Sequence, residues 1–170
     1  EIISGGVAKD GIPSIDNPVF HSVMEEDFLE EDDIGIGLVY KGQIKFYPYK
    51  ILVGHEIVNE EEYVVTYCPL CGTGIVFKNQ GMEFGVSGKL WRSNLLMYNR
   101  GENESLWSQV LGEAVTGPFA GTKLDIINAD TVKYEDWKEE YPETLVLSPV
   151  GSIGLDPYGD YYTNDYVGFG

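Results

Sequence analysis

The chain has 170 residues, 43% of them hydrophobic, and carries a formal net charge of −17. This length and composition fit one globular domain with its own core, so we predict a single domain over residues 1–170. So large a negative charge repels phosphate backbones and anionic lipids, which argues against nucleic-acid partners. No apolar run approaches the roughly 18 residues that a membrane-spanning helix needs, which argues against membrane insertion.

The first 33 residues read as an irregular acidic leader. Residues 4–18 are interrupted by Gly and Pro too often for a regular element. An acidic block follows, which is typical of a solvated loop or helix face. It consists of Glu25, Glu26, Asp27, Glu30, Glu31, Asp32 and Asp33.

Short strand patterns dominate the rest of the chain. Apolar residues at 34–38 and 44–47 flank the turn residues Lys41 and Gly42, which predicts a hairpin. Helical patterns are limited to 49–54 and to 132–141, before Pro142. We therefore predict a mainly β fold, a barrel- or sandwich-like single domain with a few short helices. The further predicted strands are 63–67, 74–77, 82–86, 95–98, 124–127 and 144–147.

Residues 151–170 are rich in Gly, Asp and Tyr. We interpret them as a tail that leads to a second half missing from this chain. Four oxygen-bearing side chains of this tail lie a few residues apart, as in a loop, and could bind calcium, which prefers oxygen ligands. The candidates are Asp156, Asp160, Asn164 and Asp165. Asn103 begins an Asn-Glu-Ser glycosylation sequon, which matters only in an exported protein.

The only two cysteines, Cys68 and Cys71, form a Cys-Pro-Leu-Cys motif. A disulfide across so short a loop contributes only about 2 kcal/mol of stability in the chain-entropy model, so stability alone does not explain the spacing. The spacing suits dithiol exchange, in which one thiol attacks and the other resolves the mixed disulfide. The glycines that follow, Gly72 and Gly74, predict a turn rather than the helix that usually follows a redox motif of the thioredoxin type.

The same cysteines could instead bind a metal ion. Two thiolates and the imidazole of His55 would form a three-ligand set for Cu(I), or for zinc with an exogenous fourth ligand. Met97 could add a weak thioether, although a methionine between apolar neighbours more often fills the core. An inert pair with a structural His55 is a third interpretation, and the sequence leaves the three open.

A second group of residues could form a pocket beside the cysteines. Trp91, Arg92, Ser93 and Asn94 combine an aromatic ring with a cation and two polar side chains, which suits ligand recognition. Packing of the tryptophan under a loop is the alternative.

Several runs of this sequence resemble domain of unknown function 3179, a family of archaeal and bacterial proteins that are often secreted or lipid-anchored. Family members continue beyond this chain into a second half. Glu60 and Asn99 stand where the family commonly has Asp. The resemblance implies an extracytoplasmic location and places the cysteines in the densest family motif. The matching runs are 10–13, 55–59, 66–74, 84–88, 93–98, 105–109 and 145–148.

These observations predict an extracytoplasmic protein with a soft-metal or thiol/disulfide redox centre built on Cys68, Cys71 and His55. A metal centre would hold copper or zinc, and a thiol/disulfide centre would act with a redox partner protein. The alternative is a structural subunit of a cell-surface or extracellular assembly that self-associates, with calcium as a possible requirement. Whether the protein is an enzyme stays open.

Overall fold

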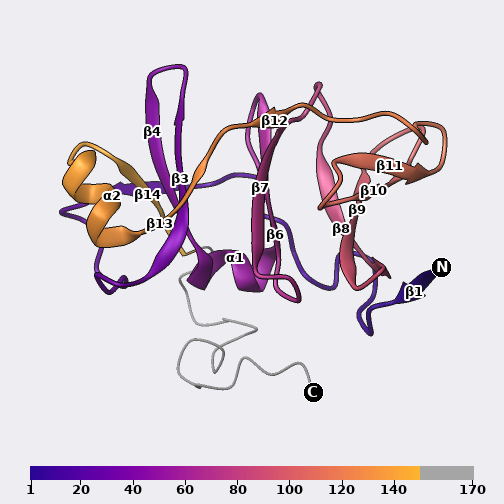
Figure 1. The fold of residues 1–170 in the computed structure, drawn as a ribbon, viewed down its shortest axis with the longest axis horizontal. Helices are drawn as coiled ribbons and strands as arrows, with labels where there is room; N and C mark the ends of the chain where they lie inside the picture. The colour runs from indigo at the N-terminus through magenta and orange to yellow at the C-terminus, as the bar shows by residue number, and fades with distance from the viewer. Residues whose placement is uncertain (150–170) are drawn as a thin grey trace.

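The computed structural model describes residues 1–149, which form three stacked β-sheets and two short helices. The β9 sheet has the order β1-β8-β9-β10-β11, the central sheet β12-β7-β6-β5, and the β4 sheet β13-β3-β4-β14-β2. Figure 1 shows them side by side, with the central sheet between the other two. The strands are β1 (Ile2–Ser4), β2 (Phe20–Ser22), β3 (Ile34–Tyr40), β4 (Gln43–Pro48), β5 (Ile57–Asn59), β6 (Tyr63–Cys68), β7 (Thr73–Lys78), β8 (Phe84–Trp91), β9 (Asn94–Asn99), β10 (Leu106–Ser108), β11 (Glu113–Thr116), β12 (Ile126–Ile127), β13 (Asp130–Lys133) and β14 (Leu145–Leu147).

The central sheet is buried on both faces, and β6 contributes apolar side chains to each face, with Thr66 as its one polar residue. Tyr63, Val65 and Tyr67 point into the core shared with the β4 sheet. Val64 and Cys68 point into the core shared with the β9 sheet. Since side chains alternate along a strand, this register fixes which face of the sheet Cys68 occupies.

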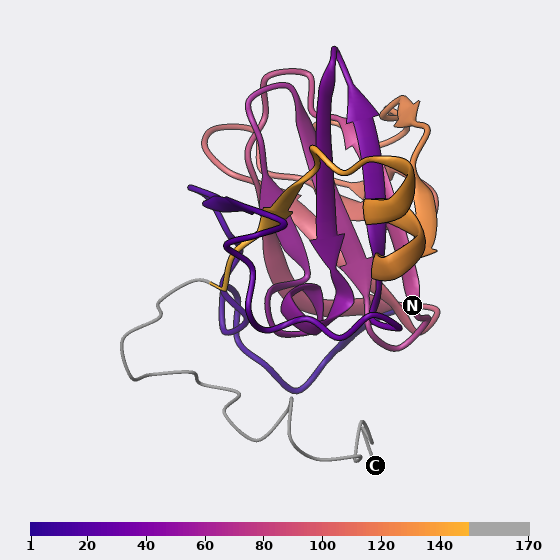
Figure 2. The same cartoon turned by 90° about the vertical axis from the view of Figure 1, so that its left-hand side faces the viewer.

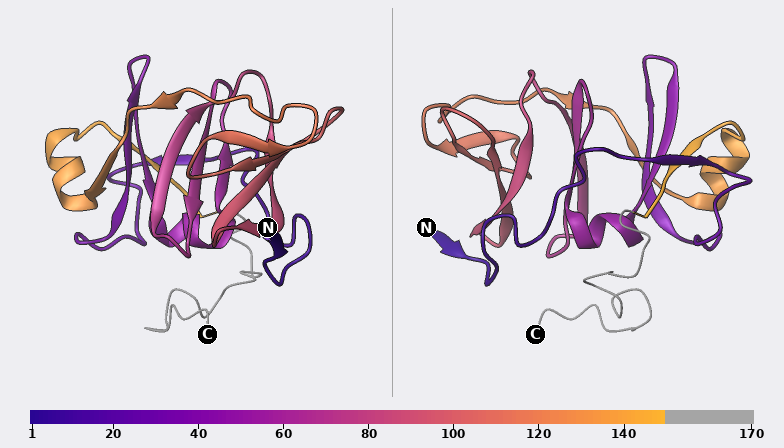
Figure 3. Two further views of the ribbon diagram at one scale, coloured as in Figure 1. Left: turned by 45° about the vertical axis from the view of Figure 1, so that its right-hand side comes forward. Right: turned by 180° about the vertical axis from the view of Figure 1, so that it is seen from behind.

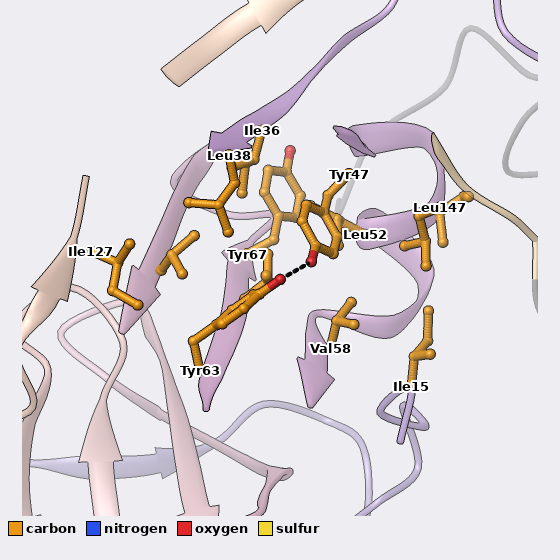
Figure 4. Packing of buried hydrophobic residues seen from close by; sticks show 13 residues of the cluster. Ile15, Ile36, Leu38, Tyr47, Leu52, Val58, Tyr63, Tyr67, Ile127 and Leu147 are labelled. Atoms are coloured by element: carbon orange, nitrogen blue, oxygen red, sulfur yellow. Dashed lines mark hydrogen bonds between the residues drawn. The ribbon is translucent and has the colours of Figure 1, made fainter. Parts of the chain in front are cut away.

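A hydrogen bond between tyrosines joins the central sheet to the β4 sheet inside the first of these cores. The hydroxyl groups of Tyr47 on β4 and Tyr63 on β6 lie 2.8 Å apart (Figure 4). Tyr47 also donates to Glu60 at 2.8 Å. Buried hydroxyls need such partners, so this pair specifies how the two sheets align.

The two helices lie at different places in the stack. Helix α1 (Tyr49–His55) follows β4 and leads into β5, and its buried side chains Ile51 and Leu52 join the core between these sheets. Helix α2 (Tyr134–Glu140) covers the outer face of the β4 sheet (Figure 2). Trp137 of this helix packs there with Phe46.

The leader crosses the stack and contacts each sheet in turn, as the right-hand view of Figure 3 shows. Strand β1 pairs with β8, Ile15 forms a bridge to Val58 of the central sheet, and β2 pairs with β14. The leader is therefore not wholly irregular. Short segments of the leader pair with the edge of each of the three sheets.

The prediction of a mainly β, sandwich-like domain is confirmed, and the sheets of residues 1–149 do not close into a barrel. The predicted hairpin is present as β3 and β4. The second predicted helix begins later, at Tyr134, because the residues before it form β13. Strands β5, β10 and β11 were missed because they are too short for a clear alternating pattern. No helix among the described residues has the length and apolar character to cross a membrane.

Candidate dithiol site

The cysteine motif forms the connection between β6 and β7. Cys68 is the last residue of β6 and pairs with Thr73, the first residue of β7. The Cys71 amide donates to the Cys68 carbonyl oxygen at 3.2 Å. Gly72 then takes φ +60, a left-handed conformation that a glycine adopts without steric cost. The predicted turn after the motif is thus present, and no helix follows the cysteines.

The two thiols lie in contact but differ in access to solvent. Their Sγ atoms are 3.2 Å apart, compared with about 2.05 Å in a disulfide, and both are free thiols. Cys68 is only 1% exposed, whereas Cys71 is exposed. Burial raises the pKa of the Cys68 thiol to about 11, and the hydrogen bond to Cys71 adds to the shift. Cys71 is therefore the more accessible thiol of the pair.

A buried polar network holds the exposed thiol in place. The Asn94 amide nitrogen donates to Cys71 Sγ at 3.4 Å and to the Gln109 side-chain oxygen at 3.2 Å. Gln109 in turn donates to the Thr66 hydroxyl and the Thr73 carbonyl oxygen. The network joins β6, β7 and β9 beneath the cysteine loop. It also presents an N–H donor to the sulfur, which stabilises negative charge that develops there.

A pocket of about 270 Å³ opens beside Cys68. Its walls are mostly apolar, and among residues 1–149 its titratable side chains are Glu56, Cys68 and Lys89. The leader forms one wall, the cysteine loop a second, and strands β8 and β9 a third. The lining residues are Gly5, Val7, Ile12, Glu56, Cys68, Pro69, Leu70, Val86, Gly88, Lys89, Leu90 and Leu95.

Glu56 is the residue in this pocket that the sequence interpretation missed. It is 6% exposed, and its carboxyl group forms no hydrogen bond or ion pair with the residues of 1–149. Burial raises its pKa from 4.5 to about 7. The only signal in the sequence is an acidic residue directly before the apolar pair Ile57 and Val58, and a glutamate there reads equally well as a surface residue.

The backbone at Glu56 is unusual as well. The residue ends α1 in the left-handed conformation, with φ +64, and its amide donates to the Leu52 carbonyl oxygen at 2.7 Å. Glycine or asparagine usually occupies this position, because other residues pay about 1–2 kcal/mol of steric strain there. A glutamate at this point is therefore both strained and desolvated.

His55 and Met97 each have structural partners. The Nδ1 atom of His55 donates to the Pro13 carbonyl oxygen at 2.8 Å, which ties α1 to the leader. Met97 is fully buried in the core between the central and β9 sheets. Within residues 1–149, no three His, Cys, Asp or Glu side chains are grouped so as to hold a metal ion. The copper or zinc centre stays a prediction.

The β8–β9 turn carries the predicted pocket residues, and they divide into two pairs. Ser93 and Asn94 contact Cys71, since the thiol lies 3.6 Å from the Ser93 carbonyl oxygen. Arg92 stacks on the Trp91 ring, 4.7 Å from its centre. Asn103 of the sequon lies in an exposed loop. The four calcium candidates, Asp156, Asp160, Asn164 and Asp165, lie outside the described residues.

A comparison with curated proteins and one with solved structures each found no match. A comparison with protein families matched residues 9–170 to the family described as protein of unknown function (DUF3179). This match covers nearly the whole chain and includes the cysteine motif, Glu56 and the polar network. The chain therefore belongs to the DUF3179 family.

Proposed function

We propose that the protein is a thiol–disulfide exchange protein whose reactive pair is Cys71 and Cys68. One observation carries the proposal: the two free Sγ atoms lie 3.2 Å apart, and one is exposed while the other is buried. This asymmetry matches the two roles in dithiol exchange, because the attacking thiol must reach a substrate and the resolving thiol must not.

In the proposed exchange reaction, a substrate disulfide oxidises the protein dithiol. The Cys71 thiolate attacks one substrate sulfur, the substrate S–S bond breaks, and the first substrate thiol leaves with the electron pair. The Cys68 thiolate then attacks Cys71 Sγ, releases the second substrate thiol and forms the Cys68–Cys71 disulfide. The substrate gains two electrons and two protons, which the protein dithiol loses. A dithiol reductant restores the starting state.

The site supports each step with a feature of its own. Asn94 offers its N–H to the sulfur on which charge develops in the first step. The hydrogen bond between the thiols keeps Cys68 within reach for the second. The extracytoplasmic location and a redox partner protein belong to this proposal. Assembly into a surface structure stays the alternative, and its calcium candidates are outside the described residues.

The neutral disulfide 4,4′-dithiodipyridine tests the proposal, because each attack on it or on its mixed disulfide releases one coloured thiopyridone. We expect the reduced protein to release two equivalents in two phases. The Cys68→Ser variant should release one equivalent in the fast phase alone. The Cys71→Ser variant should react at least tenfold more slowly, because its remaining thiol is buried.

Two results would reject this proposal. Release of a single equivalent by the wild-type protein would show that Cys68 does not resolve the mixed disulfide. Equal rates for Cys71→Ser and Cys68→Ser would show that the exposed thiol is not the attacking one.

A further inference from the structure

The resolving step needs a proton acceptor that the cysteine pair does not contain. Cys68 is buried, and burial raises its pKa to about 11, so almost all of it is protonated at neutral pH. Only a thiolate attacks a disulfide efficiently. A group that can take this proton must therefore lie within reach of Cys68, directly or through one water molecule.

The pocket beside Cys68 contains a carboxyl group, which is the candidate acceptor. Glu56 and Cys68 both line it, although they come from different elements, the end of α1 and the end of β6. Their backbones are adjacent, since the Tyr67 amide donates to the Glu56 carbonyl oxygen at 2.8 Å. Within residues 1–149 the Glu56 carboxyl group has no hydrogen-bond or ion-pair partner, and its oxygens are not fully enclosed.

We infer that Glu56 is the proton acceptor for Cys68 when Cys68 attacks the mixed disulfide on Cys71. This inference rests on the proposed exchange function and adds a third residue to it. In the step, the proton on Cys68 Sγ moves to the Glu56 carboxylate, the Cys68–Cys71 bond forms, and the bond from Cys71 to the substrate sulfur breaks. The departing substrate thiolate takes a proton, which the protonated Glu56 or solvent supplies.

The surroundings suit Glu56 to this role at neutral pH. An ordinary glutamate, with a pKa near 4.5, is too weak a base for a thiol, whereas the pKa of about 7 at Glu56 lies closer to that of Cys68. Lys89 is the one other titratable residue that residues 1–149 place on the pocket walls, and its side chain is exposed. The strain and burial of Glu56 described above lower stability, and a proton-accepting role gives them a function.

The two-phase release of thiopyridone also tests this inference, because the first phase does not involve Glu56. In Glu56→Gln, which keeps the shape of the side chain, we expect an unchanged first phase and a second phase slowed about 10- to 100-fold. Glu56→Asp should recover part of the rate. In the wild-type protein the second phase should accelerate as pH rises through about 7, and Glu56→Gln should lack this rise.

Glu61→Gln is the matched control, because Glu61 is exposed and its loss changes the net charge by the same amount. It should leave both phases unchanged. A second phase of wild-type rate in Glu56→Gln would overturn the inference and leave the exchange function standing. Slowing of both phases to the same degree would also overturn it, since Glu56 would then act only by shaping the cysteine loop. Loss of the second phase from the wild-type protein would instead reject the exchange function itself.

Discussion

Glu56 links the chemistry of the site to the stability of the fold. Its pKa is about 7 in the folded protein and 4.5 as the reference value, so the folded state binds this proton more tightly than the unfolded state. Below pH 4.5 Glu56 is protonated in both the folded and the unfolded state, so its ionisation does not affect stability. As pH rises from 4.5 to 7 the unfolded state ionises first, and stability falls by about 3 kcal/mol.

Replacement of Glu56 by Gln should therefore stabilise the protein in a pH-dependent way. At pH 8 we expect Glu56→Gln to be more stable than wild type by up to about 3 kcal/mol, because the buried charge is gone. At pH 4 the two proteins should agree within about 1 kcal/mol. Denaturant unfolding at both pH values measures the difference. A gain of the same size at pH 4 and pH 8 would show that Glu56 is not desolvated as described.

At the scale of elements, close packing between β3 and α2 holds the outer helix on the β4 sheet. Gly37 lies on β3 opposite Trp137, and a Cβ atom added to it would lie 2.5 Å from carbons of the indole ring. Trp137 is buried, and its ring nitrogen donates to the Thr144 hydroxyl at 2.9 Å. The ring cannot move away without breaking that bond.

We expect Gly37→Ala to destabilise the protein by about 3 kcal/mol, because overpacking here moves either the strand or the helix. Gly42→Ala is the matched control. Gly42 has φ +78 and open space around it, so alanine there costs only about 1 kcal/mol of backbone strain. Thermal or denaturant unfolding of both variants gives the comparison. Equal losses would mean that Trp137 adjusts freely and that α2 is not tightly held.

At the scale of the whole molecule, the leader joins the three sheets and also closes one side of the pocket. Arg100, just beyond β9, binds it through Asp10 at 3.2 Å, Asp16 at 3.0 Å and the Ser14 hydroxyl at 2.9 Å. It also pairs with Glu83. Because several carboxylates share one guanidinium, these bonds act together, unlike an isolated surface ion pair.

Loss of Arg100 should loosen the leader and expose Cys68. In a Cys71→Ser background, we expect Arg100→Met to raise the alkylation rate of Cys68 by about tenfold, because local opening of the leader becomes easier by about 1.4 kcal/mol. Lys9→Met, which removes an exposed pair between the leader and Glu104, should change the rate less than twofold. Timed alkylation with a neutral reagent measures both. An unchanged rate in Arg100→Met would show that the leader does not limit access to the pocket.

The sequence by itself determined the fold class and pointed to the cysteine pair as the candidate site. Alternating apolar residues in short runs predicted a mainly β domain, since a strand buries every second side chain. The turn after the isolated cysteine pair was also predicted. The pocket proposed for Trp91, Arg92, Ser93 and Asn94 stays a prediction, although Ser93 and Asn94 contact Cys71. The strand patterns and the turn are local features, so residue type and spacing are enough to predict them.

Only the tertiary structure decided which thiol is buried, which carboxyl lies beside it and what His55 contacts. Each depends on segments far apart in the sequence: the leader and β8 cover Cys68, the end of α1 brings in Glu56, and Pro13 takes the hydrogen bond of His55. Burial is a property of what packs against a residue, and it shifts the pKa of a thiol or carboxyl without any mark in the local sequence. That is why two cysteines of identical chemistry differ in exposure in this fold.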